Sequence, residues 1–347
     1  MSANKVRPIA LLTLIALTGC GTIGQASGRS GTHHRTKVSG SRSKTTKKAA
    51  TTTRGGKMMV LGFWAHHKSL PATSLASEKH SLTAISPLWY GLTASGGVKT
   101  KVDTSLLSET KKLHIPITPI VNDVTGTQAF LTSKATRTTA VQTIDHIVAS
   151  MHYRGVNIDF EPPHTHLRSE LTAFMVQLRD TLPKTDTITM DVVPHSGGAY
   201  DYTKLAPEVN QFVLMSYDEH SDGTPAGPVA AMNWVKSITT RMTRKVPPSK
   251  VMLGVALYGY SWPSGSTHAT TIPYYAITAA DKSHATWNTR YQEMTATVGP
   301  DVLWWENRKS MAEKIAFAKS SHVAGIALWQ VGYANPAVYS LLAKDAG

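Results

Sequence analysis

Eight short apolar runs recur along the chain between residues 57 and 331, and this recurrence limits the possible folds more than any other feature. The runs are nearly continuous in apolar residues, as expected for strands that are covered on both faces. Segments with the spacing of amphipathic helices separate several of them. The strand-like runs are 57–65, 82–92, 115–123, 155–161, 187–193, 211–217, 250–260 and 323–331, and the helical patterns are 136–153, 168–182, 227–243 and 309–321.

Strands that alternate with helices indicate βα units and a parallel sheet, so the sequence predicts the α/β class. Eight such strands in about 290 residues match a (β/α)8 TIM barrel. An open, doubly wound sheet is the alternative, but no glycine-rich phosphate loop follows the first run. About 62 residues separate the seventh run from the eighth, which predicts a small insertion between these two strands.

The first 20 residues have the composition of a targeting segment. Lys5 and Arg7 precede an apolar run, residues 9–17, that is too short to span a bilayer. The run ends in Leu-Thr-Gly-Cys, and Cys20 is the only cysteine of the chain. This ending resembles a bacterial lipobox, and a plain cleaved signal peptide is the alternative. We therefore expect lipidation at Cys20, which would anchor the protein to the membrane at the bacterial cell envelope. The alternative is a secreted or spore-associated protein.

Residues 21–56 have almost nothing to bury and predict a disordered, basic Ser/Thr/Lys tether. This tether is either a passive spacer or a contact to anionic wall polymer or lipid headgroups. Residues 1–57 hold 11 Lys and Arg and no acidic residue, whereas the rest of the chain holds 25 basic and 22 acidic residues. The net charge of +14 therefore belongs to a tail, and we expect no nucleic-acid partner. The barrel is predicted to occupy residues 57–347 and to be a monomer.

The fourth run, GVNIDFE at 155–161, places a polar residue at every second position. In a barrel strand these side chains point inward and rise toward the C-terminal mouth, where barrel enzymes carry their chemistry. Two prolines follow the run and end the strand. Glu161 should therefore lie at the rim of the barrel, with Asp159 one layer below it and Asn157 below that.

Two neighbouring buried carboxyls raise the pKa of at least one of them, and a carboxyl with a raised pKa can act as a general acid. Glu161 and Asp159 on one strand lie on the same side of any ligand. They cannot flank a glycosidic bond from opposite faces, as a usual acid and nucleophile pair does. The arrangement suits a reaction in which the substrate supplies the nucleophile. A structural polar cluster or a cation site is the alternative.

The motif GVNIDFE resembles the catalytic strand of glycoside hydrolase family 18, the chitinase-like barrels. LMSYDEH at 214–220 resembles the Met-x-Tyr-Asp motif of the sixth strand, and GIALWQVG at 325–332 resembles the tryptophan motif of the eighth strand. Segments 199–218 and 304–329 resemble the branch that contains spore-germination and spore-cortex peptidoglycan hydrolases. The motifs occur in the order of the family, and the resemblance covers roughly residues 57–347.

The resemblance implies that Glu161 protonates the leaving oxygen while the 2-acetamido group of the substrate attacks the anomeric carbon, with retention. Asp159 would orient the acetamide and balance its charge, and Tyr217 would donate a hydrogen bond to its oxygen. No metal or other cofactor is implied. The further substrate-binding candidates are Asn157, Asp218, Trp329, Tyr258 and Phe63, although core packing is an equal alternative for the last two.

Asn157 departs from the family pattern, because many members carry aspartate there. An amide cannot share a proton with Asp159, but it can donate a hydrogen bond to it. His164 and His166 have a spacing that suggests a metal site, but no further ligands with suitable spacing accompany them, so we expect no metal.

Three classes of function remain: a glycosidase acting on an N-acetylated glycan, a chitinase-like lectin without activity, and a structural envelope lipoprotein. The presence of the acid favours the glycosidase, since inactive relatives commonly lack it. Peptidoglycan is favoured over a chitin-like substrate because of the branch resemblance, the lipobox and the basic tether.

Overall fold

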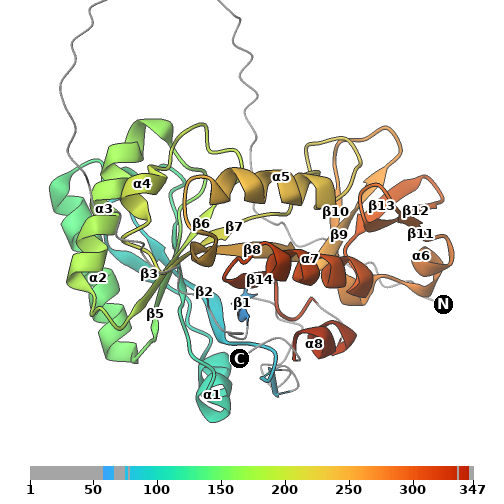
Figure 1. Cartoon of the computed structure of the whole chain (residues 1–347). Helices are drawn as coiled ribbons and strands as arrows, with labels where there is room; N and C mark the ends of the chain where they lie inside the picture. Colours follow the sequence, from blue (N-terminus) through green and yellow to red (C-terminus); the bar gives the residue numbers. More distant parts are fainter. Residues whose placement is uncertain (1–57, 66–74, 77–78, 334–335, 344–347) are drawn as a thin grey trace, which may run out of the picture. The chain divides into compact units, whose positions relative to one another are not determined.

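The computed structural model describes residues 58–65, 75–76, 79–333 and 336–343 (Figure 1). The chain divides into two units, 1–56 and 57–347, and all described residues belong to the second. The signal segment 1–20, the lipidation at Cys20 and the tether 21–56 lie outside the described residues and stay predictions. Among the residues described, no helix combines the length and the apolar character needed to cross a membrane.

Eight parallel strands close into a barrel, which confirms the predicted (β/α)8 architecture. β14 pairs with both β8 and β1, and β1 also pairs with β2, so the sheet has no open edge at this point. The barrel strands are β1 (Met59–Trp64), β2 (Ala84–Leu92), β4 (Ile120–Asp123), β5 (Gly155–Asp159), β6 (Thr187–Val192), β7 (Gln211–Leu214), β8 (Val251–Ala256) and β14 (Gly325–Trp329).

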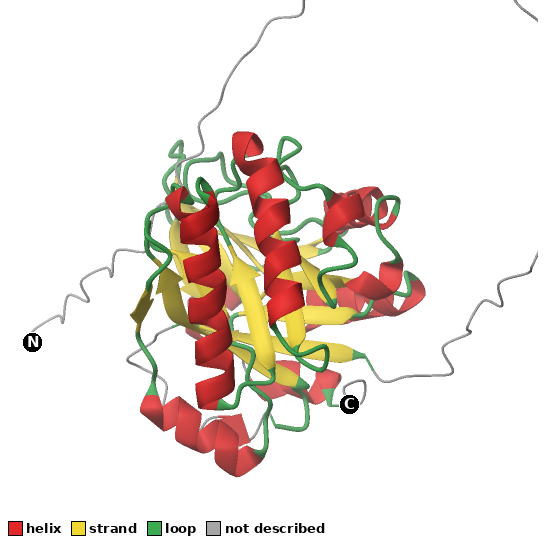
Figure 2. Cartoon of the chain, turned by 90° about the vertical axis from the view of Figure 1, so that its left-hand side faces the viewer, coloured by secondary structure: helices red, strands yellow, loops and turns green. Residues whose placement is uncertain are grey.

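Helices cover the outer face of these strands, as Figure 2 shows. Each of the four predicted helical segments contains a helix, although the helix predicted over 227–243 begins only at Met232. Side chains cap the starts of two of them; the Asn307 side chain, for example, accepts hydrogen bonds from two backbone N–H groups at the start of α7. The helices are α1 (Thr104–Leu113), α2 (Lys134–Met151), α3 (Arg168–Thr181), α4 (Tyr202–Leu205), α5 (Met232–Thr243), α6 (Ala279–Ser283), α7 (Arg308–Ser320) and α8 (Pro336–Leu342), with short 3-10 turns η2 (Ala129–Leu131), η3 (Thr165–Leu167), η4 (Pro248–Lys250) and η5 (Tyr274–Ala276).

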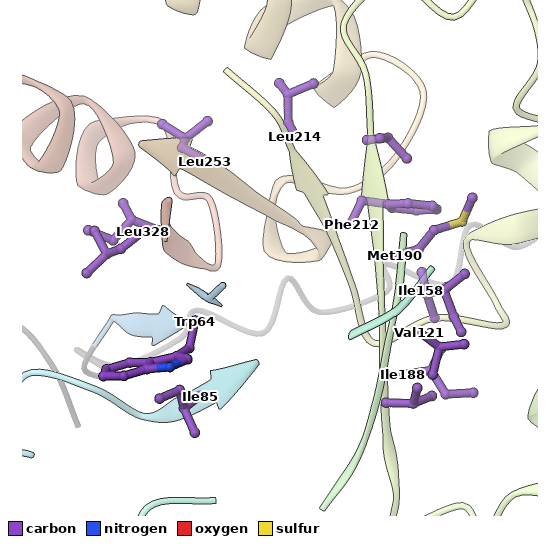
Figure 3. Close-up of a cluster of buried hydrophobic side chains, with 14 of the residues drawn as sticks. Trp64, Ile85, Val121, Ile158, Ile188, Met190, Phe212, Leu214, Leu253 and Leu328 are labelled. Carbon is purple, nitrogen blue, oxygen red and sulfur yellow. The ribbon is translucent and has the colours of Figure 1, made fainter. Parts of the chain in front are cut away.

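The alternation of side chains along the strands creates two cores. The larger core lies between strands and helices, and every barrel strand contributes to it (Figure 3). The smaller core fills the inside of the barrel with Leu61, Phe63, Ile120, Val213, Met252 and Ala327. This filled interior leaves the C-terminal mouth as the place where polar side chains can gather.

A five-stranded antiparallel sheet lies between β8 and β14, where the sequence predicted an insertion. Its strands are β9 (Tyr258–Pro263), β10 (Thr270–Pro273), β11 (Thr286–Asn288), β12 (Glu293–Val298) and β13 (Asp301–Trp305), in the order β10-β9-β13-β12-β11. A further short strand, β3 (Val98–Thr100), pairs antiparallel with β2.

The prediction of one strand over 250–260 was wrong, because the chain changes partners at Leu257. The backbone N–H of Leu257 donates to the carbonyl of Trp329 at 2.7 Å, which ends the barrel pairing. Tyr258 then pairs antiparallel with Pro273. The whole run is apolar, so its periodicity could not reveal the break. Tyr258 and Tyr260 therefore belong to the insertion.

Buried charged residues fix the insertion to the barrel. Lys314 of α7 contacts Glu306 at 2.5 Å, with both side chains at most 2% exposed. Glu293 of β12 accepts hydrogen bonds from the backbone N–H groups of Val229 at 2.8 Å and Ala230 at 2.5 Å. Buried charges are tolerated only when they are paired and hydrogen-bonded in this way. The insertion, α7 and the segment before α5 therefore share one polar network.

Candidate active site

Four carboxyl groups meet at the C-terminal mouth of the barrel. Asp159 ends β5, Asp191 lies on β6, and Glu161 and Asp218 follow β5 and β7. Burial is the largest cause of a raised pKa at both Glu161 and Asp191. The neighbouring charges of Asp159 and Asp218 raise the pKa of Glu161 further, and those of Asp159 and Glu161 raise the pKa of Asp191 further. The four groups therefore form one electrostatic cluster, which we call the carboxylate cluster.

Burial and mutual repulsion keep protons in this cluster. Burial, followed by the charges of Asp159 and Asp218, raises the pKa of Glu161 to about 8. Burial raises the pKa of Asp159 to about 6. The Asp159 Oδ1 atom is buried and has no hydrogen-bond partner among the described residues. Near neutral pH, Glu161 is thus protonated and able to donate, while Asp159 ionises more readily.

The predicted alternation along β5 is confirmed. Val156, Ile158 and Phe160 are buried in the outer core, and the Phe160 ring lies 5.0 Å from that of Phe130. Asn157 is fully buried and points the other way. This outward packing of every second residue directs the polar residues of the strand to the barrel interior.

Asn157 has a different partner from the one expected. Its Nδ2 atom donates to Thr189 Oγ1 at 2.9 Å and to Asp191 Oδ1 at 2.8 Å, and no hydrogen bond to Asp159 is present in the described part of the chain. The amide therefore connects β5 to β6 and acts on the cluster through Asp191. This hydrogen bond opposes the rise in the pKa of Asp191 that burial and the neighbouring carboxyls cause.

Tyr217 follows β7 and faces the carboxylate cluster. Burial raises the pKa of Tyr217 well above its usual value, and the charges of Asp191, Glu161, Asp218 and Asp159 raise it further. Its phenol therefore stays protonated and available as a hydrogen-bond donor.

Asp218 is held by two tyrosines of the insertion. The hydroxyl groups of Tyr258 and Tyr260 donate to Asp218 Oδ1 at 2.5 and 2.9 Å. Burial raises the pKa of Asp218, and the two hydrogen bonds partly counter this rise. Tyr258 is only 3% exposed, so it reaches the site through Asp218 and not through an open face. The insertion thus supplies one wall of the site.

Trp329 lies at the end of β14 and is half-buried. Its ring packs on that of Phe63 with centroids 5.3 Å apart and planes at 58°. Phe63 is completely buried in the inner core. Of the two interpretations that the sequence left open for Phe63, the structure supports core packing, with Phe63 lying against Trp329.

Three further residues belong to the site, although the sequence analysis did not name them as candidates. Asp191 occupies an inward position in an apolar strand, so the alternation that identified Asp159 could have found it. Tyr200 is buried, and the nearby Glu161 charge adds to the effect of burial in raising its pKa. Gln128 donates through Nε2 to the carbonyl of Pro162 at 2.6 Å. No local pattern marks Gln128.

His164 and His166, whose spacing suggested a metal site, lie close together. His164 Nε2 lies 3.0 Å from the carbonyl oxygen of Gly126, and its ring lies 5.4 Å from that of His166. Within the described ranges, no group of three His, Cys, Asp or Glu residues is arranged to hold a metal ion.

Comparisons with known proteins give a family match and several relatives. Residues 106–334 match the profile of Glycosyl hydrolases family 18. The uncharacterized glycosylase YvbX of Bacillus subtilis is 27% identical over 55% of this chain and 61% of its own length. The cortical fragment-lytic enzyme of Bacillus anthracis is 24% identical over 76% of this chain and 68% of its own length.

A solved structure has the same fold. The spore cortex-lytic enzyme SleL of Bacillus cereus superposes with a TM-score of 0.77 at 19% identity, covering 85% of this chain and 76% of that one. The chain spans about three fifths to two thirds of the length of the curated relatives named above.

Proposed function

This chain belongs to glycosyl hydrolases family 18, and we propose from this premise that it is a retaining glycosidase that cleaves β-1,4 bonds next to N-acetylglucosamine. The observation that supports the proposal is the carboxyl of Glu161 at the rim of the barrel. Its pKa is raised to about 8, and a second buried carboxyl, Asp159, is its neighbour. A group of this kind can hold a proton at neutral pH and release it to a leaving oxygen.

The proposed reaction uses the substrate's own acetamide. Glu161 donates its proton to the glycosidic oxygen as the anomeric C–O bond breaks, and the acetamide carbonyl oxygen bonds to the anomeric carbon. Asp159 balances the positive charge on the resulting oxazolinium ring, and Tyr217 donates a hydrogen bond to the acetamide. Water then opens the ring and returns a proton to Glu161. Two inversions at one carbon give retention.

Two residues complete the proposed sugar site. The half-buried ring of Trp329 at the floor would stack against the apolar face of the sugar bound there. Asp218, held by Tyr258 and Tyr260, would bind a hydroxyl of the same sugar. Trp329 is positioned by Phe63 of the barrel and Asp218 by the insertion before any substrate arrives, which lowers the cost of ordering the site.

The proposed substrate is bacterial peptidoglycan or spore cortex. The cortical fragment-lytic relative supports this choice, and so do the predicted lipobox at Cys20 and the basic segment that follows it. We propose accordingly that the protein is a monomer anchored at the outer side of the membrane, where the wall polymer lies. Chitin-type oligosaccharides are the alternative substrate.

Product analysis tests this proposal. The full chain and its Glu161→Gln variant are incubated with purified peptidoglycan, spore cortex and chitin oligomers, and the products are read by mass. We expect new reducing ends at N-acetylglucosamine from peptidoglycan or cortex, and none from the variant. Reducing ends at muramic-type sugars would mean that the other glycosidic bond is cleaved. The absence of products from all three glycans would contradict the proposal.

The amide at position 157 is expected to tune the pH profile. Asn157→Asp adds a carboxyl beside Asp191, so the pKa values of the groups in the carboxylate cluster should rise. We expect activity to persist and the alkaline limb of kcat/KM against pH to move up by about 0.5–1 unit. Asn233→Asp, on the exposed side of α5, is the control. An unchanged profile would contradict a role of Asn157 in proton tuning.

A further inference from the structure

The end of the barrel opposite the carboxylate cluster carries an excess of positive charge. In a parallel barrel, the segments that lead into the strands all lie at this end. The acidic side chains that accompany the cations on these segments within the described residues are fewer: Asp180, Asp186, Glu208 and the largely buried Glu109. Two of them form ion pairs at 3.8 Å, Glu109 with Lys112 and Asp180 with Lys184. The exposed cations, which we call the basic face, are Lys79, Lys111, Lys112, Arg154, Lys184, Arg241, Arg244, Lys245 and Lys319.

Helix dipoles explain part of this charge but not all of it. The last turns of α1, α5 and α7 contain Lys111, Lys112, Arg241 and Lys319, where a cation stabilises a helix. Lys184 and Arg244 have the same role, since Lys184 Nζ donates to the carbonyl of Arg179 in the last turn of α3 at 3.3 Å and Arg244 is the C-cap of α5. Lys79 and Arg154 lie instead in the loops that lead into β2 and β5.

The chain enters the barrel at this same end, because β1 begins at Met59. The preceding 57 residues hold 11 Lys and Arg and no acidic residue. The covalent connection therefore joins a basic segment to the basic face, while Glu161 and Asp159 lie at the opposite end of the strands. Repeated cations next to a membrane attract it when its lipids are anionic.

We propose that the basic face docks on an anionic phospholipid bilayer and directs the mouth of the barrel away from it. The proposal does not depend on which glycan the site cleaves. It predicts that the folded barrel, and not only its N-terminal segment, contributes to membrane affinity. Docking in this orientation would present the carboxylate cluster to polymer that lies beyond the membrane surface.

Vesicle binding tests this proposal with two variants of the full chain that lose the same charge. The first is Arg154→Gln, Lys184→Gln, Arg244→Gln and Lys245→Gln on the basic face, and the matched control is Lys99→Gln, Lys134→Gln, Lys236→Gln and Lys282→Gln elsewhere on the surface. On vesicles of phosphatidylglycerol and phosphatidylcholine, we expect the first to lose affinity at least tenfold and the control less than threefold. Equal losses, or no loss, would overturn the proposal.

Orientation is read with a fluorescent label in a Cys20→Ser background. The label is attached either to Ser249→Cys, at the end of the barrel that carries the basic face, or to Ser283→Cys, on the insertion. Both positions are exposed. A headgroup quencher should quench only the label at position 249, and equal quenching of both labels would overturn the orientation.

Retained affinity for anionic wall polymer without vesicle binding would overturn the membrane proposal and make that polymer the partner instead. Hydrolysis of soluble oligomers by the basic-face variant should stay unchanged, which separates this test from the proposed function.

A second, independent observation concerns Gln128, whose side chain is 1% exposed. Its Nε2 atom donates to the carbonyl of Pro162 at 2.6 Å and to that of Phe160 at 3.4 Å, and these two residues flank Glu161. Its backbone N–H donates to Asp123 Oδ2 at 2.6 Å. Because β5 ends at Asp159, the sheet itself does not hold the backbone around Glu161.

We infer that Gln128 is a positioning residue for Glu161, an inference that rests on the proposed function. One amide fixes the backbone on both sides of the proton donor, and Asp123 at the end of β4 fixes the amide's own loop. A proton donor that moves by about 1 Å loses much of its effect, even when the substrate still binds.

Gln128→Leu removes both hydrogen bonds with little change in volume. We expect kcat to fall about ten- to a hundredfold while KM changes less than threefold. Gln177→Leu is the control, since Gln177 donates to Thr138 at 3.0 Å between two outer helices. Circular dichroism shows whether the leucine variant folds. If it does not, Gln128→Asn takes its place in the same kinetic measurement. An unchanged kcat in a folded variant would overturn the inference, whereas an inactive wild type would instead contradict the proposed function.

Discussion

Glu161→Gln is expected to lower kcat about 10³- to 10⁴-fold, with KM nearly unchanged. Glutamine preserves the shape of the side chain but has no acidic proton to give to the leaving oxygen. The measurement is steady-state hydrolysis of a soluble N-acetylated oligosaccharide by the full chain. A substrate whose leaving group needs no proton should recover part of the rate, because only the acid step is lost. A rate within tenfold of the wild type would refute the assignment of Glu161 as the acid.

Stability against pH provides the control for this variant. The folded-state pKa of Glu161, about 8, lies above its usual value of 4.5. Its contribution to the free energy of unfolding is therefore complete below pH 4.5 and is lost as the pH rises through about 8. Glutamine carries no charge to bury, so the variant should equal or exceed the wild type in stability above pH 8. An inactive variant that is also less stable there would indicate a folding defect.

Asp159→Asn is expected to lower kcat about 10²- to 10³-fold. The substitution removes the negative charge that would balance the oxazolinium ring. It also removes one of the charges that raise the pKa of Glu161, so the alkaline limb of the pH profile should move to lower pH. The measurement is kcat/KM across pH values with the same soluble substrate.

An exposed aspartate provides the comparison for Asp159. Asp180→Asn lies on α3 far from the mouth and should leave the profile unchanged. If Asp159→Asn lowered kcat without moving the alkaline limb, the electrostatic link between Asp159 and Glu161 would be refuted. If neither quantity changed, Asp159 would have only a structural role.

The alternation of polar and apolar residues in 155–161 was sufficient to predict the inward position of Asp159. The same rule applied to 187–193 would have revealed Asp191. Tyr217 and Trp329 needed the family resemblance, because a lone aromatic residue in an apolar run carries no functional signal. The local pattern therefore predicted positions on strands, and the motifs predicted which of these positions belong together.

The remaining features depend on contacts that are distant in sequence. The end of β8 at Leu257 is set by a change of partner, while the run itself stays apolar. Gln128 reaches carbonyls 32 and 34 residues away. Phe63 and Trp329 are both aromatic and lie near the C-terminal ends of barrel strands. The sequence does not show that Phe63 is completely buried while Trp329 is only half-buried, because this difference depends on how the two rings pack in the folded barrel.

The two hydroxyl groups that reach Asp218 have a consequence for how such a protein can diversify. The base of the insertion contacts the carboxylate cluster through Tyr258 and Tyr260, and Glu293 connects the insertion to the segment before α5. Replacing this segment with that of a homologue would therefore disable the recipient unless the new segment also carries these three residues. The hairpin turn at residues 264–269 adds a further constraint. The backbone N–H of Ala269 donates to Asp222 Oδ1 at 2.9 Å, and the carbonyl of Thr267 accepts from the backbone N–H of Gly223 at 2.9 Å, so a new loop grafted there would have to keep these contacts.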